Sequence, residues 1–225
     1  MPKSHLVDAE GLVLNRSPAG ERHLRLTLLT PALGLITALF RESRPAGGVA
    51  TKSSRVRSGV MEQPDVFDHA NVQLEAPKPG AAHSSAYFVR EYKVLRRHAG
   101  LGRRYPALEA AAGLSTFVAH NARHFETCAP VYDLCRRAFA ALDEGAAPEA
   151  VRLKALFLIA RAEGYAALEQ WLPSLPTADQ ALILTVINRP AAEAAALAVE
   201  DATRLPRLRR AFERWLAEHT DLEIK

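Results

Sequence analysis

The chain has 225 residues, of which 48% are hydrophobic and 24% are charged, a composition typical of a globular protein and not of a disordered or fibrous one. Apolar runs such as residues 155–160 are far shorter than the roughly 20 residues of a membrane-spanning helix, so we expect no membrane association. The net charge of +4 permits nucleic-acid binding without requiring it.

Cysteine usage and the first residues indicate a compartment. Two cysteines are too few for a disulfide framework, and the opening residues, MPKSHLVDAEG, lack the apolar segment of a secretory signal. We therefore expect a cytoplasmic protein with reduced thiols.

Short strands are predicted for the first 75 residues. Leu24, Leu26 and Leu28 alternate with polar residues, as in a strand with one buried face. Gly- and Pro-containing turns separate five such segments, at residues 10–15, 22–30, 33–40, 55–62 and 65–75. Five strands in this length predict an oligonucleotide-binding (OB) type β barrel over residues 1–78.

Helical periodicity dominates after the linker at residues 75–85. We expect an all-α domain over residues 79–225, which gives a multi-domain α+β fold. Apolar stripes predict helices over residues 131–142 and 205–216, and the very apolar segment 149–163 predicts a central buried helix that ends at Gly164. Thr177 and Gln180 match a capping box ahead of a helix at residues 181–188.

Motifs of catalysis and metal binding are missing from the sequence. We find no nucleotide-binding glycine loop, no nucleophile elbow and no metalloprotease motif. His120, His124, Cys128 and Cys135 do not have the spacing of a zinc site, and Cys135 lies on an apolar helical stripe. We expect no enzyme activity, no cofactor and no bound metal, although a catalytic site assembled only by tertiary contacts stays an alternative.

Basic segments are the most informative feature. Residues 40–59, FRESRPAGGVATKSSRVRSG, contain five cations and one acid, and residues 90–104 contain seven basic residues, His98 included, and one acid. The second segment fits a helix with Phe88, Tyr92, Leu95 and Ala99 on its buried side. The cations near residues 204–214 alternate with acids and are explained by ion pairs within a helix.

Unpaired cations on one face neutralise phosphates, so we expect DNA binding through the backbone with weak sequence specificity. Aromatic residues for base stacking are few in the first 75 residues, so single and double strands are expected to bind alike. The candidate DNA-binding residues are Arg22, Arg25, Arg41, Arg44, Lys52, Arg55, Arg57, Arg90, Lys93, Arg97, Arg103 and Arg104.

Three stretches resemble the family of RecO recombination mediators. They are AEGLVLNRSPAGERHLRLTLLTPALGLITALFR (9–41), AFAALDEGAAPEAVRLKALFLIARAEGY (138–165) and LPRLRRAFERWLAEHTDLEIK (205–225). The resemblance implies an OB barrel with a helical domain and a non-catalytic role. RecO-like proteins bind DNA, anneal strands, contact the acidic C-terminal tail of single-stranded DNA-binding protein, and work with RecR to load RecA in DNA repair.

Two features depart from the family pattern. Gly164-Tyr165 is followed by AALEQWLPSLPTADQ, which lacks the four-cysteine zinc module of many members, so zinc is not carried over. The basic loop after Phe40 is diluted by Gly47, Gly48 and Ala50. A diverged protein–protein adaptor with weak or no DNA binding is therefore the alternative function.

Partner binding has a candidate site beside the apolar 151–159 segment. An acidic peptide with an apolar end needs an apolar pocket with a cationic rim. The candidate cations are Arg136, Arg152, Lys154 and Arg161, and the alternative is that their stems only cover the edge of the core.

Overall fold

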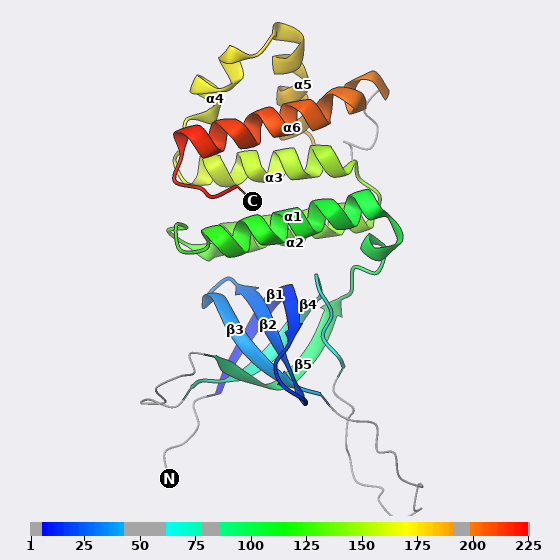
Figure 1. The fold of residues 1–225 in the computed structure, drawn as a ribbon, viewed down its shortest axis with the longest axis vertical. Helices are drawn as coiled ribbons and strands as arrows, with labels where there is room; N and C mark the ends of the chain where they lie inside the picture. Colours follow the sequence, from blue (N-terminus) through cyan, green and yellow to red (C-terminus); the bar gives the residue numbers. More distant parts are fainter. Residues whose placement is uncertain (1–5, 43–61, 78–85, 191–198, 225) are drawn as a thin grey trace, which may run out of the picture. The chain divides into compact units, whose positions relative to one another are not determined.

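The computed structural model describes residues 6–42, 62–77, 86–190 and 199–224 (Figure 1). Within these ranges five strands precede six α-helices, so the predicted α+β class is confirmed. The chain divides into two compact units. Residues 1–28 with 36–97 make the sheet unit, and residues 29–35 with 98–225 make the helical unit.

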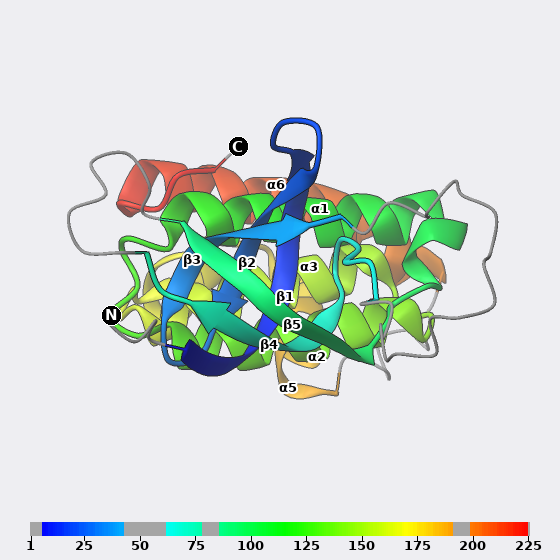
Figure 2. The ribbon, with the colours of Figure 1, turned by 90° about the horizontal axis from the view of Figure 1, so that it is seen from below.

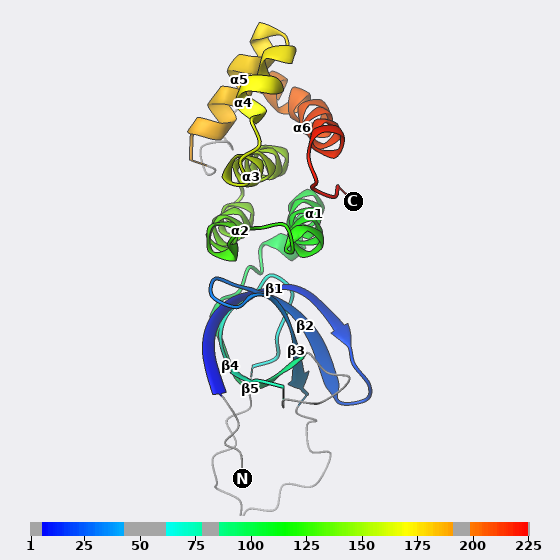
Figure 3. The same ribbon diagram turned by 90° about the vertical axis from the view of Figure 1, so that its left-hand side faces the viewer.

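The sheet unit is built from five strands (Figure 2; Figure 3). The strands are β1 (Leu6–Pro18), β2 (His23–Thr30), β3 (Gly34–Arg41), β4 (His69–Glu75) and β5 (Tyr87–Arg96). Their order is β1-β2-β3-β5-β4, and β4 pairs antiparallel with β1. The β3–β5 pair is parallel.

Alternation places apolar side chains on the inner side of this sheet. Leu24, Leu26 and Leu28 of β2 are all buried, as their spacing predicted. On β3 and β5, the rings of Phe40 and Tyr92 meet edge to face with centroids 6.0 Å apart. Residues at the intervening positions therefore face outward.

Four predicted strands overlap β1 to β4. β4 begins only at His69, because residues 65–68 turn, with Phe67 in the left-handed region at φ 68°. The predicted strand at 55–62 lies outside the described residues except for Glu62, which is not in a strand.

The fifth strand, β5, corrects the helix predicted over residues 90–104. Buried Val89 and Tyr92 are three residues apart because the register with β4 shifts between Gln73 and Leu74. This bulge interrupts the period of two, and the resulting spacing resembles that of a helix. The sheet unit consequently extends to Arg97, beyond the domain boundary predicted at residue 78.

The helical unit surrounds one buried helix. Its helices are α1 (Tyr105–Asn121), α2 (Cys128–Asp143), α3 (Pro148–Ala162), α4 (Ala167–Gln170), α5 (Thr177–Asn188) and α6 (Val199–His219). α3 contacts α1, α2, α5 and α6 (Figure 3), which confirms the predicted central helix. It ends before Gly164, whose φ of 83° is readily adopted only by glycine.

The predicted capping box of α5 is wrong. Pro176 occupies the N-cap position, and Thr177 is the first helical residue and not the cap. The side-chain amide of Gln180 instead donates to the carbonyl of Leu175 at 2.8 Å. Pro176 presets a φ compatible with helix entry, so the helix starts one residue earlier than a threonine cap would allow.

A buried carboxylate fixes the turn that leads into β4. Asp68, whose side chain is 1% exposed, accepts hydrogen bonds from the Tyr92 hydroxyl at 3.1 Å and from the Arg97 guanidinium at 3.0 Å. It also accepts from the backbone N–H of Asp65 at 2.9 Å. Burial, followed by the Asp68 charge, raises the pKa of Tyr92 above its ordinary value.

Replacing Asp68 by alanine is expected to lower the free energy of unfolding by about 2–3 kcal/mol, because it leaves the buried Tyr92 hydroxyl without an acceptor. Urea unfolding followed by circular dichroism measures this change. Asp65→Ala, which removes a side chain that is 60% exposed, is the matched control and should cost less than about 1 kcal/mol. Equal losses in the two variants would contradict the role assigned to Asp68.

Cys135 makes the stability of the helical unit sensitive to alkaline pH. Complete burial raises the pKa of its thiol from 9.0 to about 12. A raised pKa means that the folded state holds its proton longer, so stability is full below pH 9 and is lost between pH 9 and about 12. The slope from this group should approach about 1.4 kcal/mol per pH unit.

The Cys135→Ala variant tests this expectation. Its free energy of unfolding should decline less steeply than that of the unsubstituted chain between pH 9 and 11. The fluorescence of Trp171 and Trp215, both buried in the helical unit, follows the transition. Parallel pH profiles for the two proteins would contradict the thiol's contribution.

Candidate nucleic-acid and peptide interfaces

Three predicted DNA-binding arginines gather on the outer side of β2 and β3. Arg25 alternates with buried Leu24 and Leu26, and Arg41 follows buried Phe40, so both face outward. Arg22 lies just before β2 and is exposed. We call Arg22, Arg25 and Arg41 the cationic face.

Strand pairing brings these residues together. The backbone N–H of Glu42 donates to the carbonyl of Arg22 at 2.9 Å, which ties the open ends of β2 and β3. Counting inward from this antiparallel pair sets Arg41 opposite His23 and Arg25 opposite Leu39. Arg25 and Arg41 are therefore diagonal neighbours, within reach of adjacent phosphates.

Side chains of the cationic face are available to a ligand. No ion-pair partner is found for Arg22, Arg25 or Arg41 among the residues that the structure describes. The other cations of the basic loop, Arg44, Lys52, Arg55 and Arg57, lie outside the described residues.

Predicted cations of the 90–104 segment are instead engaged within the protein. Arg90 pairs with Glu75. Arg97, whose side chain is 47% exposed, binds the buried Asp68 carboxylate, and this bond raises the pKa of the guanidinium. The structure places neither residue on the cationic face.

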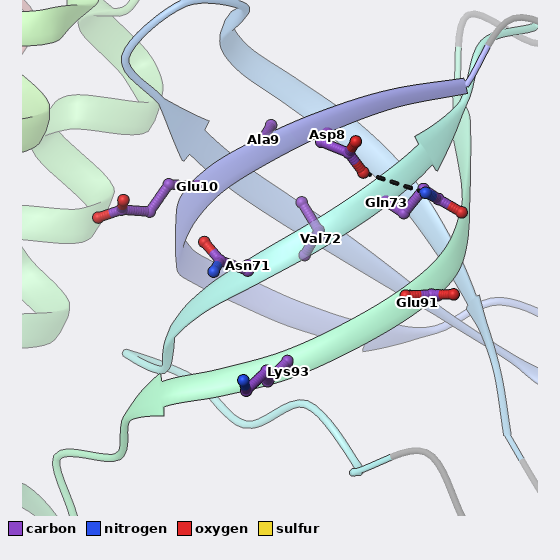
Figure 4. Close-up of a pocket in the computed structure, with 8 residues that line it drawn as sticks. All are labelled: Asp8, Ala9, Glu10, Asn71, Val72, Gln73, Glu91 and Lys93. Carbon is purple, nitrogen blue, oxygen red and sulfur yellow. Dashed lines mark hydrogen bonds between the residues drawn. The ribbon is translucent and has the colours of Figure 1, made fainter. Parts of the chain in front are cut away.

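Lys93 lines a hollow of about 410 Å³ on the outer side of β1, β4 and β5 (Figure 4). Asp8, Glu10 and Glu91 line the same hollow, and Asp8 accepts a hydrogen bond from Gln73 at 3.1 Å. Three carboxylates beside one ammonium disfavour a polyanion. Because this segment is a strand and not a helix, Lys93 does not lie on the cationic helix face that was predicted to bind DNA.

The last two predicted DNA-binding residues belong to the helical unit. Arg103 is exposed on a short 3₁₀ helix, Leu101–Arg103. Arg104 donates to the backbone carbonyl of Leu142 at the end of α2. Arg104 therefore satisfies a helix C-terminus, where cations are favourable.

A groove of about 590 Å³ lies between α2 and α3. Its apolar lining comes from Pro130, Leu134, Ala138, Val151, Ala155, Leu158 and Pro190, and its charged lining from Asp133, Arg137 and Lys154. Burial lowers the pKa of Lys154. The groove combines apolar walls with cations, as the predicted peptide site requires.

Lys154 alone among the four predicted peptide-binding cations lines this groove. Arg136 pairs with Asp133 at 3.1 Å. Arg161 is exposed near the end of α3.

Arg152 has a structural role in the helical unit. It binds Glu213 of α6 at 2.8 Å, and a Cβ added at Gly113 would lie only 2.7 Å from its Nη1 atom. Arg152 and Lys154 are two residues apart on α3 and therefore point to different sides of the helix. Arg152 meets α6, whereas Lys154 lines the groove beside α2.

Sequence reasoning missed two residues at these surfaces. Arg137 lines the groove and pairs with Asp133 at 2.7 Å. Phe88, assigned to a buried helix face, is 39% exposed on β5. If residues 87–89 had been interpreted as a strand, alternation would have predicted that Phe88 faces outward. The position of Arg137 in the groove depends on how α2 packs against α3, which the sequence alone does not show.

Metal ligands do not converge in the described ranges. No group of three or more His, Cys, Asp or Glu side chains that could hold a metal is present in the part of the chain that the structure describes. Cys135 is fully buried, and His124 accepts a hydrogen bond from Arg123 at 3.1 Å.

The chain matches no protein-family model and no curated protein. None of the described helices is both long enough and apolar enough to cross a membrane.

Proposed function

We propose that this chain is a non-catalytic DNA-binding protein of the RecO type. It binds single- and double-stranded DNA through phosphates in the bacterial cytoplasm and promotes strand annealing and RecA loading in DNA repair. The cationic face carries the proposal, since Arg25 and Arg41 face outward on two adjacent strands, exposed Arg22 lies just before the first of them, and none of the three has an ion-pair partner among the described residues. Such a surface gains affinity by releasing counterions from DNA.

The sheet unit is further inferred to be an OB barrel. Support comes from the order β1-β2-β3-β5-β4, in which β1 pairs with β4 and β3 runs parallel to β5. OB barrels have five strands and bind ligands over strands 2 and 3, the strands that hold Arg25 and Arg41.

The α2–α3 groove supports the second half of the proposal. An apolar channel with Lys154 and Arg137 at its edge suits a peptide that has acidic residues and an apolar end. We assign to it the C-terminal tail of single-stranded DNA-binding protein, while RecR remains a proposed partner without an assigned surface.

Neutralising the cationic face tests DNA binding. In the triple variant Arg22→Gln, Arg25→Gln, Arg41→Gln, affinity for a short single strand should fall about tenfold or more, and the log–log salt slope should become shallower by about 2, since each neutralised phosphate contributes about 0.7. Fluorescence anisotropy over a range of salt concentrations measures both quantities.

A matched control removes three exposed arginines of the helical unit, as Arg161→Gln, Arg210→Gln, Arg214→Gln. It has the same net charge and should retain most of the affinity and the salt slope. If both triple variants lost the same amount of DNA affinity, the loss would be explained by net charge alone and the cationic face would not be the binding surface. An unsubstituted chain that binds neither strand form would favour the adaptor function.

Lys154→Gln should weaken binding of a synthetic acidic tail peptide about tenfold, because the ammonium is partly desolvated at the edge of an apolar groove. Isothermal titration calorimetry measures the affinity. Arg161→Gln removes the same charge from the same helix outside the groove and should leave the affinity within about twofold. The reverse order of effects would place the peptide elsewhere.

A further inference from the structure

An exposed aromatic ring adjoins the cationic face. Phe88 lies on β5 between Tyr87 and buried Val89, and 39% of its surface is exposed. Its register partner on β4 is Glu75, whereas the partner of Val89 is the buried Leu74. The Phe88 ring therefore stands on the outer side of the sheet.

The parallel pairing of β3 with β5 sets the neighbours of this ring. Phe88 is the register partner of Leu39, which also faces outward because Ala38 and Phe40 beside it are buried. Leu39 in turn lies opposite Arg25. An outward row thus runs from an aromatic ring through an aliphatic side chain to a guanidinium.

Strand spacing gives the dimensions of the row. Neighbouring strands are about 4.8 Å apart, so Phe88 lies about 5 Å from Leu39 and about 10 Å from Arg25. Arg41 is two residues along β3 from Leu39, a further step of about 7 Å. These distances match one nucleotide base with the phosphates on either side of it, given the reach of arginine side chains.

We propose that this row makes the surface selective for single-stranded DNA, with one unpaired base stacked on Phe88 and the flanking phosphates bound by Arg25 and Arg41. The inference rests on the proposed DNA-binding function and deepens it. An unpaired base can turn its π face to an aromatic ring, whereas bases within a duplex are already stacked on both sides. Phosphate contacts alone would not distinguish the two forms in this way.

Surrounding charges are consistent with a nucleotide at this position. Glu75, the acidic neighbour of Phe88, is paired with Arg90 and so repels a phosphate less than a free carboxylate would. The carboxylates of Asp8, Glu10 and Glu91 line the hollow on β1, β4 and β5 and do not lie in the row.

Two substitutions of Phe88 test the proposal. Phe88→Ala should weaken binding of a short single strand about tenfold and leave duplex affinity within about twofold, with an unchanged salt slope, because stacking involves no counterion release. Phe88→Trp should retain the single-strand affinity. The probes are a mixed-sequence oligonucleotide with 2-aminopurine and the duplex of the same sequence, whose affinities are measured by anisotropy.

Quenching of 2-aminopurine reports the stacking itself and should be lost in Phe88→Ala and kept in Phe88→Trp. Leu95→Ala is the matched control, since Leu95 is 43% exposed on the same strand and is not part of the row. It should change neither affinity nor quenching.

The outcomes separate this inference from the proposed function. If the unsubstituted chain binds DNA but Phe88→Ala weakens both strand forms equally or neither, the stacking proposal is overturned and phosphate binding stands. The same holds if Phe88→Ala disturbs only binding of a protein partner. If the unsubstituted chain binds no DNA, both are overturned.

Discussion

The sheet unit depends on one strand, β5, that pairs with two others at once. β5 runs antiparallel to β4 and parallel to β3, so it joins these two strands in the sheet. These pairings bring Phe88 beside Leu39 and Tyr92 against Phe40, one pair outside and one inside. β5 thus gives β3 an aromatic neighbour on each side of the sheet, Phe88 outside and Tyr92 inside.

Buried acids decide which cations remain available to a ligand. Asp68 binds Arg97, and Asp179 of α5, which is also buried, binds Arg204 and Arg207 of α6. A buried carboxylate needs such partners because its desolvation is otherwise too costly. Arg97, Arg204 and Arg207 are engaged in this way, whereas no ion-pair partner is found for Arg25 of β2 or Arg41 of β3 among the described residues.

Two sides of α3 have different surroundings in the helical unit: one packs on α6 and the other lines the groove beside α2. Arg152 faces α6, where Glu213 binds it together with Arg209, which also binds Glu149. Lys154, two residues further along α3, lies on the side of α2 and lines the groove. A rotation of about 200° between the two positions explains why neighbouring cations have unlike roles.

The sequence by itself determined the elements with a clean period: the alternating leucines of β2, the buried helix α3 and its end at Gly164, and the order of strands before helices. Each rests on local alternation of apolar residues, which burial of one face imposes. The same alternation predicted that Arg25 faces outward, and the composition of residues 40–59 pointed to Arg41 as a cation of the basic loop. Only the tertiary structure showed that residues 87–96 form a strand. A bulge interrupts the period of two in this segment, and the strands that pair with it, β3 and β4, are distant in the sequence. The tertiary structure also determined which cations form ion pairs. Asp68 and Arg97 are 29 residues apart in the chain, so a local sequence pattern does not predict their contact.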